Sequence, residues 1–111
     1  MPHYLTIYTP AVPSSGPPSP EHLAEMGKLI ERMRSRDALV TMGAMTPGSF
    51  KVRLVRGDYT VNDMPKTPEQ GFAILNAKDK ADATQMAKEF LAVAGDGESM
   101  VHPLMAQPPQ S

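Results

Sequence analysis

The chain contains no cysteine and no tryptophan, and it has only three Tyr and three Phe among its 111 residues. Without cysteine, the chain can form no disulfide, no thiolate metal site and no thiol nucleophile. Nine Met accompany this scarcity of aromatic residues. Thioether side chains fill irregular gaps, so the composition indicates a pliable aliphatic core.

The chain also lacks an excess of charge of one sign and any long apolar run. Lys and Arg number 11 against 12 Asp and Glu, which gives a formal net charge of -1. Nucleic-acid binding normally needs a basic patch that displaces counterions, so we expect no nucleic-acid partner. No apolar stretch reaches membrane-spanning length, and the N-terminus lacks the pattern of a signal peptide. We therefore expect a cytoplasmic protein with no membrane partner.

The rest of the sequence alternates between strand patterns and two helix patterns. Ser19-Pro20-Glu21 has the hydroxyl, proline and acid that favour a helix start, and the apolar spacing predicts a helix to about Arg36. Asp79 is expected to cap a second helix that runs to about Ala94. Alternating or β-rich runs predict strands at residues 3–8, 39–45, 50–55, 59–62, 71–77 and 100–104.

This order of elements predicts an α+β fold, a ferredoxin-like βαββαβ plait with an inserted β-hairpin. Two helices cannot cover all the apolar strand residues, among them Tyr4, Val52 and Leu54. We therefore expect a homodimer that buries the remaining sheet face. Residues 1–105 are expected to form one domain, and the Pro- and Gln-rich residues 106–111 a flexible tail.

The stretch Asp58–Leu75 is the first candidate for a functional site. It reads as a strand, a proline-bounded connection that carries Asp63, and a second strand from Gly71. A carboxylate beside Pro65 at a strand end is a candidate base or ligand anchor. The alternative is that Asp63 caps its own turn by accepting hydrogen bonds from nearby backbone N–H groups.

His22 is the second candidate, since it lies in the first turn of the first helix on the side of its apolar stripe. A His at the edge of an apolar stripe is commonly a residue at the boundary of the core. His3 and His102 do not form a metal-binding spacing with it. We therefore expect no metal and no cofactor.

Several segments carry a resemblance to a known family. They are PEHLAEMGKL, ALVTMGAMTPGS, VRLVRGDYTVNDMP, GFAIL and AGDGE, in this order along nearly the whole chain. The chain resembles the YCII-related family, in the subgroup marked by an Asp-Gly-Pro-Phe (DGPF) signature. Here the signature reads Asp63-Met64-Pro65-Lys66, so its Asp and Pro are present and its Gly and Phe are absent.

The resemblance implies that two ferredoxin-like subunits join through their sheets as an α+β barrel with a cleft. It implies binding of a small metabolite there, and His22-Leu23 resembles a His-Leu suspected of pairing with an Asp as an acid/base dyad. The residues expected to line the cleft are Tyr4, Met42, Met45, Met64, Pro65 and Phe72. The alternatives are a non-catalytic interaction or regulatory module of the sigma-factor-associated type, or a degenerate paralogue kept as a scaffold.

Overall fold

A computed structural model describes residues 2–12 and 18–105 of the chain. The tail predicted at 106–111, and residues 13–17 between the first strand and the first helix, lie outside the described residues. Within the described part, six strands and two helices follow one another in the predicted order. Their bounds are β1 His3–Pro10, α1 Pro20–Ser35, β2 Leu39–Met45, β3 Ser49–Val55, β4 Asp58–Met64, β5 Gln70–Asn76, α2 Lys80–Ala94 and β6 Gly97–Pro103.

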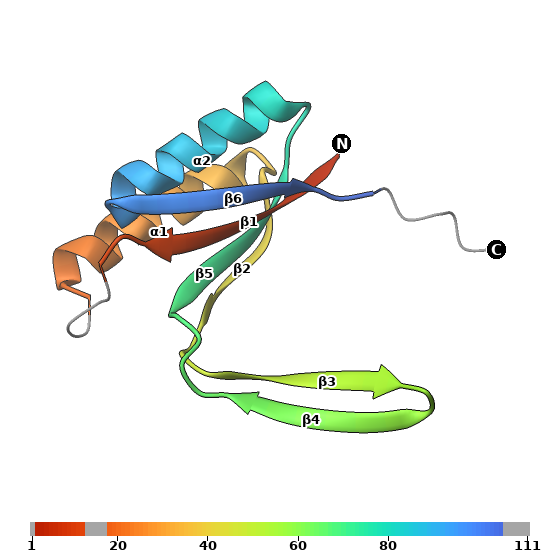
Figure 1. Cartoon of the computed structure of the whole chain (residues 1–111). Coiled ribbons are helices and arrows are strands. Elements are labelled where there is room, and N and C mark those ends of the chain that lie inside the picture. The colour runs from red at the N-terminus through yellow and green to blue at the C-terminus, as the bar shows by residue number, and fades with distance from the viewer. Residues whose placement is uncertain (1, 13–17, 106–111) are drawn as a thin grey trace.

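Four of the strands form one antiparallel sheet with the order β2-β5-β1-β6. Both helices pack on the same face of this sheet, and the opposite face carries no helix (Figure 1). The architecture is therefore an α+β plait with the ferredoxin-like βαβ topology that the sequence predicts.

The helices begin where the sequence places capping side chains. Ser19 is the N-cap of α1, and its hydroxyl accepts a hydrogen bond of 3.1 Å from the backbone N of His22. Asp79 caps α2 in the same way, accepting from the backbone N of Asp82 at 2.9 Å. Helix α2 ends at Gly95, whose φ of 100° lies in a region that side chains disfavour. These ends fix where each helix starts along the sheet.

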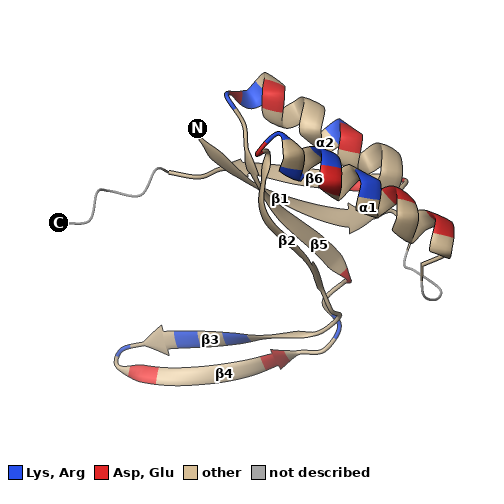
Figure 2. Cartoon of the chain, turned by 180° about the vertical axis from the view of Figure 1, so that it is seen from behind, with Lys and Arg blue, Asp and Glu red and all other residues tan. Residues whose placement is uncertain are grey.

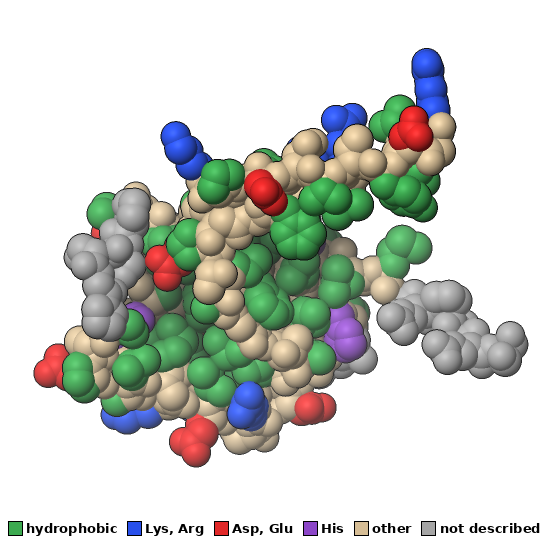
Figure 3. Space-filling view, turned by 90° about the horizontal axis from the view of Figure 1, so that it is seen from below, with side chains coloured by type: hydrophobic (Ala, Val, Ile, Leu, Met, Phe, Trp, Pro, Cys, Tyr) green, Lys and Arg blue, Asp and Glu red, His purple; other side chains and the backbone are tan. Residues whose placement is uncertain are grey.

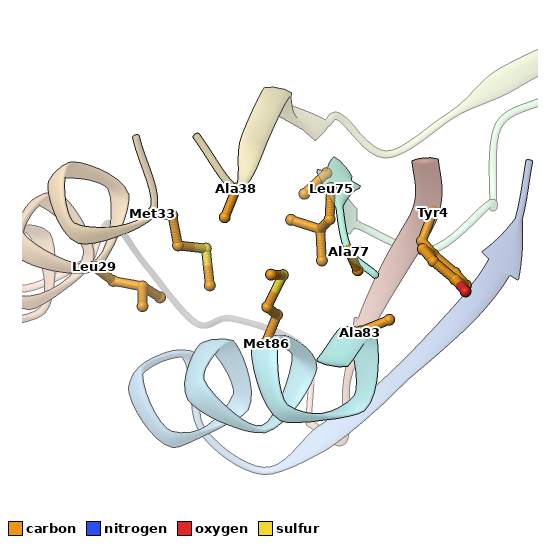
Figure 4. Packing of buried hydrophobic residues seen from close by; sticks show 9 residues of the cluster. Tyr4, Leu29, Met33, Ala38, Leu75, Ala77, Ala83 and Met86 are labelled. Carbon is orange, nitrogen blue, oxygen red and sulfur yellow. The ribbon is translucent and has the colours of Figure 1, made fainter. Parts of the chain in front are cut away.

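The core lies between the helices and the covered face of the sheet (Figure 4). Leu29 from α1 is 2% exposed, and Met86 from α2 and Leu75 from β5 pack in the same cluster. The buried hydroxyl of Thr6 donates to the carbonyl of Ala73 at 3.2 Å, which satisfies the one buried polar side chain of the described residues. Small and thioether side chains fill most of this core, as the composition indicates.

Strands β3 and β4 form a separate two-stranded sheet, which projects from the body of the molecule (Figure 1). We call this hairpin, residues 49–64, the arm. Its turn is formed by Arg56 and Gly57 at φ values of 52° and 85°, the backbone twist that two-residue hairpins require. In the described part of the chain, β3 and β4 contact chiefly each other.

The structure corrects several predicted strand bounds: β1 continues past Tyr8 to Pro10, and β6 begins at Gly97 instead of Met100. The largest consequence is at the end of β4. The sequence predicts a connection after Asn62, but β4 continues to Met64, and Asp63 pairs with Phe50 across the arm. Asp has a low strand propensity, which the paired ladder overrides here. No helix in the described residues is long and apolar enough to cross a membrane.

Candidate functional site

One side of the arm is apolar and faces no other part of the described chain. Because side chains alternate along a strand, the cross-strand pairs of the arm place five apolar residues on one side, with Asp63 opposite Phe50 at its base. The other side carries Lys51, Arg53, Thr60 and Asn62 in its middle, and Val55 and Met64 at its two ends. The residues of the apolar side are 57–74% exposed. They are Phe50, Val52, Leu54, Tyr59 and Val61. A lone two-stranded hairpin is marginally stable in water, so this side needs a surface to cover it.

The uncovered face of the four-stranded sheet is the second apolar surface. We call it the open face. The strand register aligns Phe72, Ile7 and Met100 in one cross-strand row and Ile74 and Leu5 in the next. Strands β1, β2 and β5 contain no Lys, Arg, Asp or Glu on either face (Figure 2). Seen from below, hydrophobic side chains gather on the body of the molecule and along the arm (Figure 3).

Close packing shapes the open face. A Cβ atom at Gly43 would lie 2.8 Å from the Phe72 ring, so the ring of Phe72 lies directly over the backbone of β2. Glycine at this position therefore lets the aromatic side chain lie flat against the sheet. The apolar rows of the open face are of the kind that another sheet layer can cover.

A third feature is an open-sided cavity of about 780 Å³ at the end of the sheet where β1 ends and β5 begins. Its apolar walls come from the two helices and β1. They include Pro10, Leu23, Met26, Phe90 and Ala94. The rings of Tyr8 and Phe90 meet edge to face with centroids 5.4 Å apart, which holds both in place. The volume lies within the range of small-molecule sites.

The polar groups of this cavity come from loop and strand ends. Tyr8 donates its hydroxyl to the carbonyls of Gly95 and Asp96, at 3.3 and 3.2 Å. Burial and the nearby carboxylate of Asp96 both raise the pKa of Tyr8 above its usual range. The amide nitrogen of Gln70 donates to the hydroxyl of Thr9 at 2.9 Å.

The structure does not bring the predicted catalytic pair together. His22 lines the cavity just described, and Asp63 is absent from that lining. Asp63 instead lies exposed in the arm, where its carboxylate has no hydrogen-bond partner among the described residues. It therefore does not cap its turn there, and the turn after β4 is closed by Thr67 bonding to the carbonyl of Met64. The acid/base role of Asp63 and His22 stays a prediction.

The residues predicted to line a cleft are likewise distributed over several surfaces. Tyr4 and Met42 pack on the helix side of the sheet with the core, whereas Phe72 lies on the open face. Met45 ends β2, and Met64 and Pro65 lie at the base of the arm. Their ligand-binding role stays a prediction. The described residues contain no group of three or more His, Asp or Glu side chains arranged to hold a metal ion.

The sequence analysis singles out His22 but misses other polar residues of its cavity, namely Glu69, Gln70 and Asp96. They belong to segments far apart in the chain and meet only because β1 and β5 are neighbours. The one local signal is Gly95-Asp96-Gly97. It marks a tight connection, and a Cβ at Gly97 would lie 2.5 Å from the carbonyl oxygen of Thr9.

No family model and no curated protein matches the chain. Solved structures do resemble it. CutA1 from Oryza sativa is 14% identical, with a TM-score of 0.46 over 96% of this chain and 84% of that chain. The divalent cation tolerance protein Cut A1 from Thermus thermophilus is 11% identical, with a TM-score of 0.45 over 97% and 88%. A B. subtilis GlnK–ATP complex is 15% identical, with a TM-score of 0.42 over 93% and 81%.

The assignment to the YCII-related family, and to its DGPF subgroup, is wrong. No family model supports it, and the structures that resemble the chain are CutA1 and GlnK proteins. The segments that carried the resemblance coincide with the helix starts, strands and turns of a ferredoxin-like plait, which unrelated families share. The functions implied by that resemblance, a metabolite cleft in a dimeric barrel or a sigma-factor-associated module, are withdrawn with it.

Proposed function

We propose that the chain is the subunit of a homo-oligomer, in which the apolar side of the arm of one copy covers the open face of another. The observation that supports this proposal is the amphipathic arm itself. Its five apolar side chains are 57–74% exposed, whereas the middle of the opposite side carries the polar pairs Lys51–Asn62 and Arg53–Thr60. Such alternation is typical of a ribbon with one face buried, and nothing in the described chain buries it.

The areas involved suit a reciprocal exchange between two copies. Five exposed apolar side chains offer roughly 500 Å² of surface, given that whole aromatic side chains bury about 150–250 Å². The half-buried open face adds roughly 300 Å², so one docked arm removes about 800 Å² from water. Two reciprocal contacts then bury about 1,600 Å², the usual size of a specific interface. A homodimer is the smallest assembly that closes in this way.

A direct sheet-to-sheet dimer, the arrangement expected from the sequence, is the second candidate. It would cover the open face but leave Phe50, Val52 and Tyr59 of the arm in water. Arm docking covers both apolar surfaces of the chain, and we therefore favour it. The cytoplasmic location expected from the sequence stays a prediction.

Light scattering coupled to size-exclusion chromatography tests the proposal. For a chain of 12.0 kDa, we expect a mass of twice that value or a higher multiple at micromolar concentration. Hydrogen exchange should also protect the amides of β3 and β4, because docking slows the opening of a hairpin that would otherwise fray. A monomer at all concentrations, with an unprotected arm, would refute the proposal.

A further inference from the structure

The cavity that His22 borders has a lining that, among the described residues, contains two acidic side chains and no Lys or Arg, and the proposed assembly does not explain this composition. It lies on the helix side of the sheet, whereas the arm and the open face define the proposed interface. Its walls are formed by both helices, by β1 and by the start of β5. A ligand could therefore reach it in a single subunit.

The polar groups at the cavity are mostly hydrogen-bond acceptors. The hydroxyl proton of Tyr8 is directed to the backbone carbonyls of Gly95 and Asp96, so the phenol oxygen has lone pairs left to offer. Glu69 and Asp96 contribute carboxylates.

Positive charge is lacking on the same lining. Among the described residues that line the cavity, none is Lys or Arg, and His22 is the one side chain that can carry a proton and a positive charge near neutral pH. The carboxylate of Asp96 lies close enough to Tyr8 to contribute to the raised pKa of the phenol. The described lining therefore carries two acidic side chains, Glu69 and Asp96, beside apolar walls and no Lys or Arg.

We propose that this cavity binds a small organic cation, a primary amine or related ammonium group carried on an aliphatic or aromatic body. Leu23, Met26 and Phe90 would cover the apolar body. The ammonium group would donate to the carboxylates of Glu69 and Asp96 and to the oxygen of Tyr8, which together match its three donors.

Three probes of the same size but different charge test this proposal: 2-phenylethylamine, 2-phenylethanol and phenylacetate. Binding is followed by calorimetry and by the NMR shifts of Tyr8, His22 and Phe90. The amine should bind at least about tenfold more tightly than the alcohol, because charge-assisted hydrogen bonds are roughly twice as strong as neutral ones. Phenylacetate should not bind measurably. Equal binding of the three probes, or tighter binding of phenylacetate, would overturn the proposal.

Matched variants locate the site. Glu69→Gln should weaken amine binding by about tenfold, since it removes one charged acceptor. Glu31→Gln changes the net charge equally on the exposed surface of α1 outside the cavity lining, and it should leave the affinity unchanged. Leu23→Arg places a guanidinium at a side chain that is 57% exposed, so the fold should tolerate it. It should abolish amine binding and allow phenylacetate to bind. Equal effects of the two glutamate variants would refute the assignment of the site.

Discussion

The substitution Val61→Lys gives the sharpest test of arm docking. Val61 lies in the middle of β4 on the apolar side of the arm, paired with Val52, and it is 64% exposed in the single chain. Asn62 follows it directly and points to the polar side. Asn62→Lys therefore introduces the same ammonium group one residue away on the opposite side of the same strand. Both substitutions should leave the folding of the isolated subunit unchanged.

The effect on assembly follows from what docking does to the side chain at position 61. Burying the exposed part of Val61 is worth about 1–2 kcal/mol, from the usual value for a whole aliphatic side chain. An ammonium group at that position loses this gain and adds a desolvation penalty of several kcal/mol, partly relieved because lysine can extend its charge to the rim. A net loss of about 3 kcal/mol weakens each contact by about 100-fold. In a reciprocal dimer with two such contacts, the dissociation constant should rise by about 10,000-fold.

The dissociation constants are measured by light scattering over a dilution series, and circular dichroism with thermal melts at low concentration serves as the folding control. Asn62→Lys should change the constant by less than about threefold, as surface substitutions usually do. Equal dissociation constants for the two variants would refute arm docking. So would a Val61→Lys chain that no longer folds as a monomer, because it would mean that the arm packs within its own subunit.

Mixing two variants distinguishes arm docking from a direct dimer of two open faces. Met100 lies on the open face and is 60% exposed, so Met100→Lys disables that face while its arm stays intact. In arm docking, the Val61→Lys chain keeps an intact open face, and the Met100→Lys chain keeps an intact arm that can dock on it. The mixture should therefore form heterodimers with one intact contact. A dimer of open faces would be disrupted by Met100→Lys alone, and mixing would restore nothing.

Three further predictions concern the single subunit. Gly97→Ala should destabilise the subunit by about 1–3 kcal/mol, because the new methyl group would lie 2.5 Å from the carbonyl oxygen of Thr9. Gly27→Ala in α1 should stabilise it by about 0.5–1 kcal/mol, because no atom lies within 4 Å of the new methyl group. Chemical denaturation measures both changes. The raised pKa of Tyr8 means that the folded state holds the phenol proton more tightly than the unfolded chain does. The unfolding free energy of the wild type should therefore fall as the pH rises through and above 10.0. Tyr8→Phe should lose this part of the pH dependence, as denaturation curves of the two proteins would show. Asp63→Ala should change the unfolding free energy by less than about 0.5 kcal/mol, since its carboxylate is exposed and caps no turn; a loss of about 0.5–2 kcal/mol would restore the cap interpretation.

The elements themselves could be predicted because their signals are local. Ser19 and Asp79 mark the helix starts through side-chain hydrogen bonds that span three residues, and the alternation in residues 50–55 fixes the two sides of β3. The end of β4 could not be predicted in the same way. Asp63 and Pro65 favour a connection by propensity, and the strand extends to Met64 only because β3 supplies a pairing partner as far as Ser49.

The direction of the arm could not be derived from the sequence either. Apolar alternation indicates that Val52 and Leu54 are buried in some assembly, but it does not say whether a helix of the same chain covers them. In the structure, Tyr4 lies under the helices while Val52 and Leu54 lie away from them. The sequence therefore predicts a surplus of apolar strand residues. How these residues divide between the arm and the open face depends on long-range geometry.

Strand β5 explains why the two proposed surfaces belong to one small fold. Its residues alternate between the core, which receives Ala73 and Leu75, and the open face, which receives Phe72 and Ile74. Its first two residues, Gln70 and Gly71, border the cavity at the end of the sheet. Because both faces of β5 carry apolar side chains, the strand contains no charged residue. The charged residues of the cavity, Glu69 and Asp96, therefore lie just outside the strands. In the two proposals, assembly uses the open face of the sheet and cation binding uses the cavity at the end of the sheet. Val61→Lys and Glu69→Gln should therefore each impair one of them while leaving the other intact.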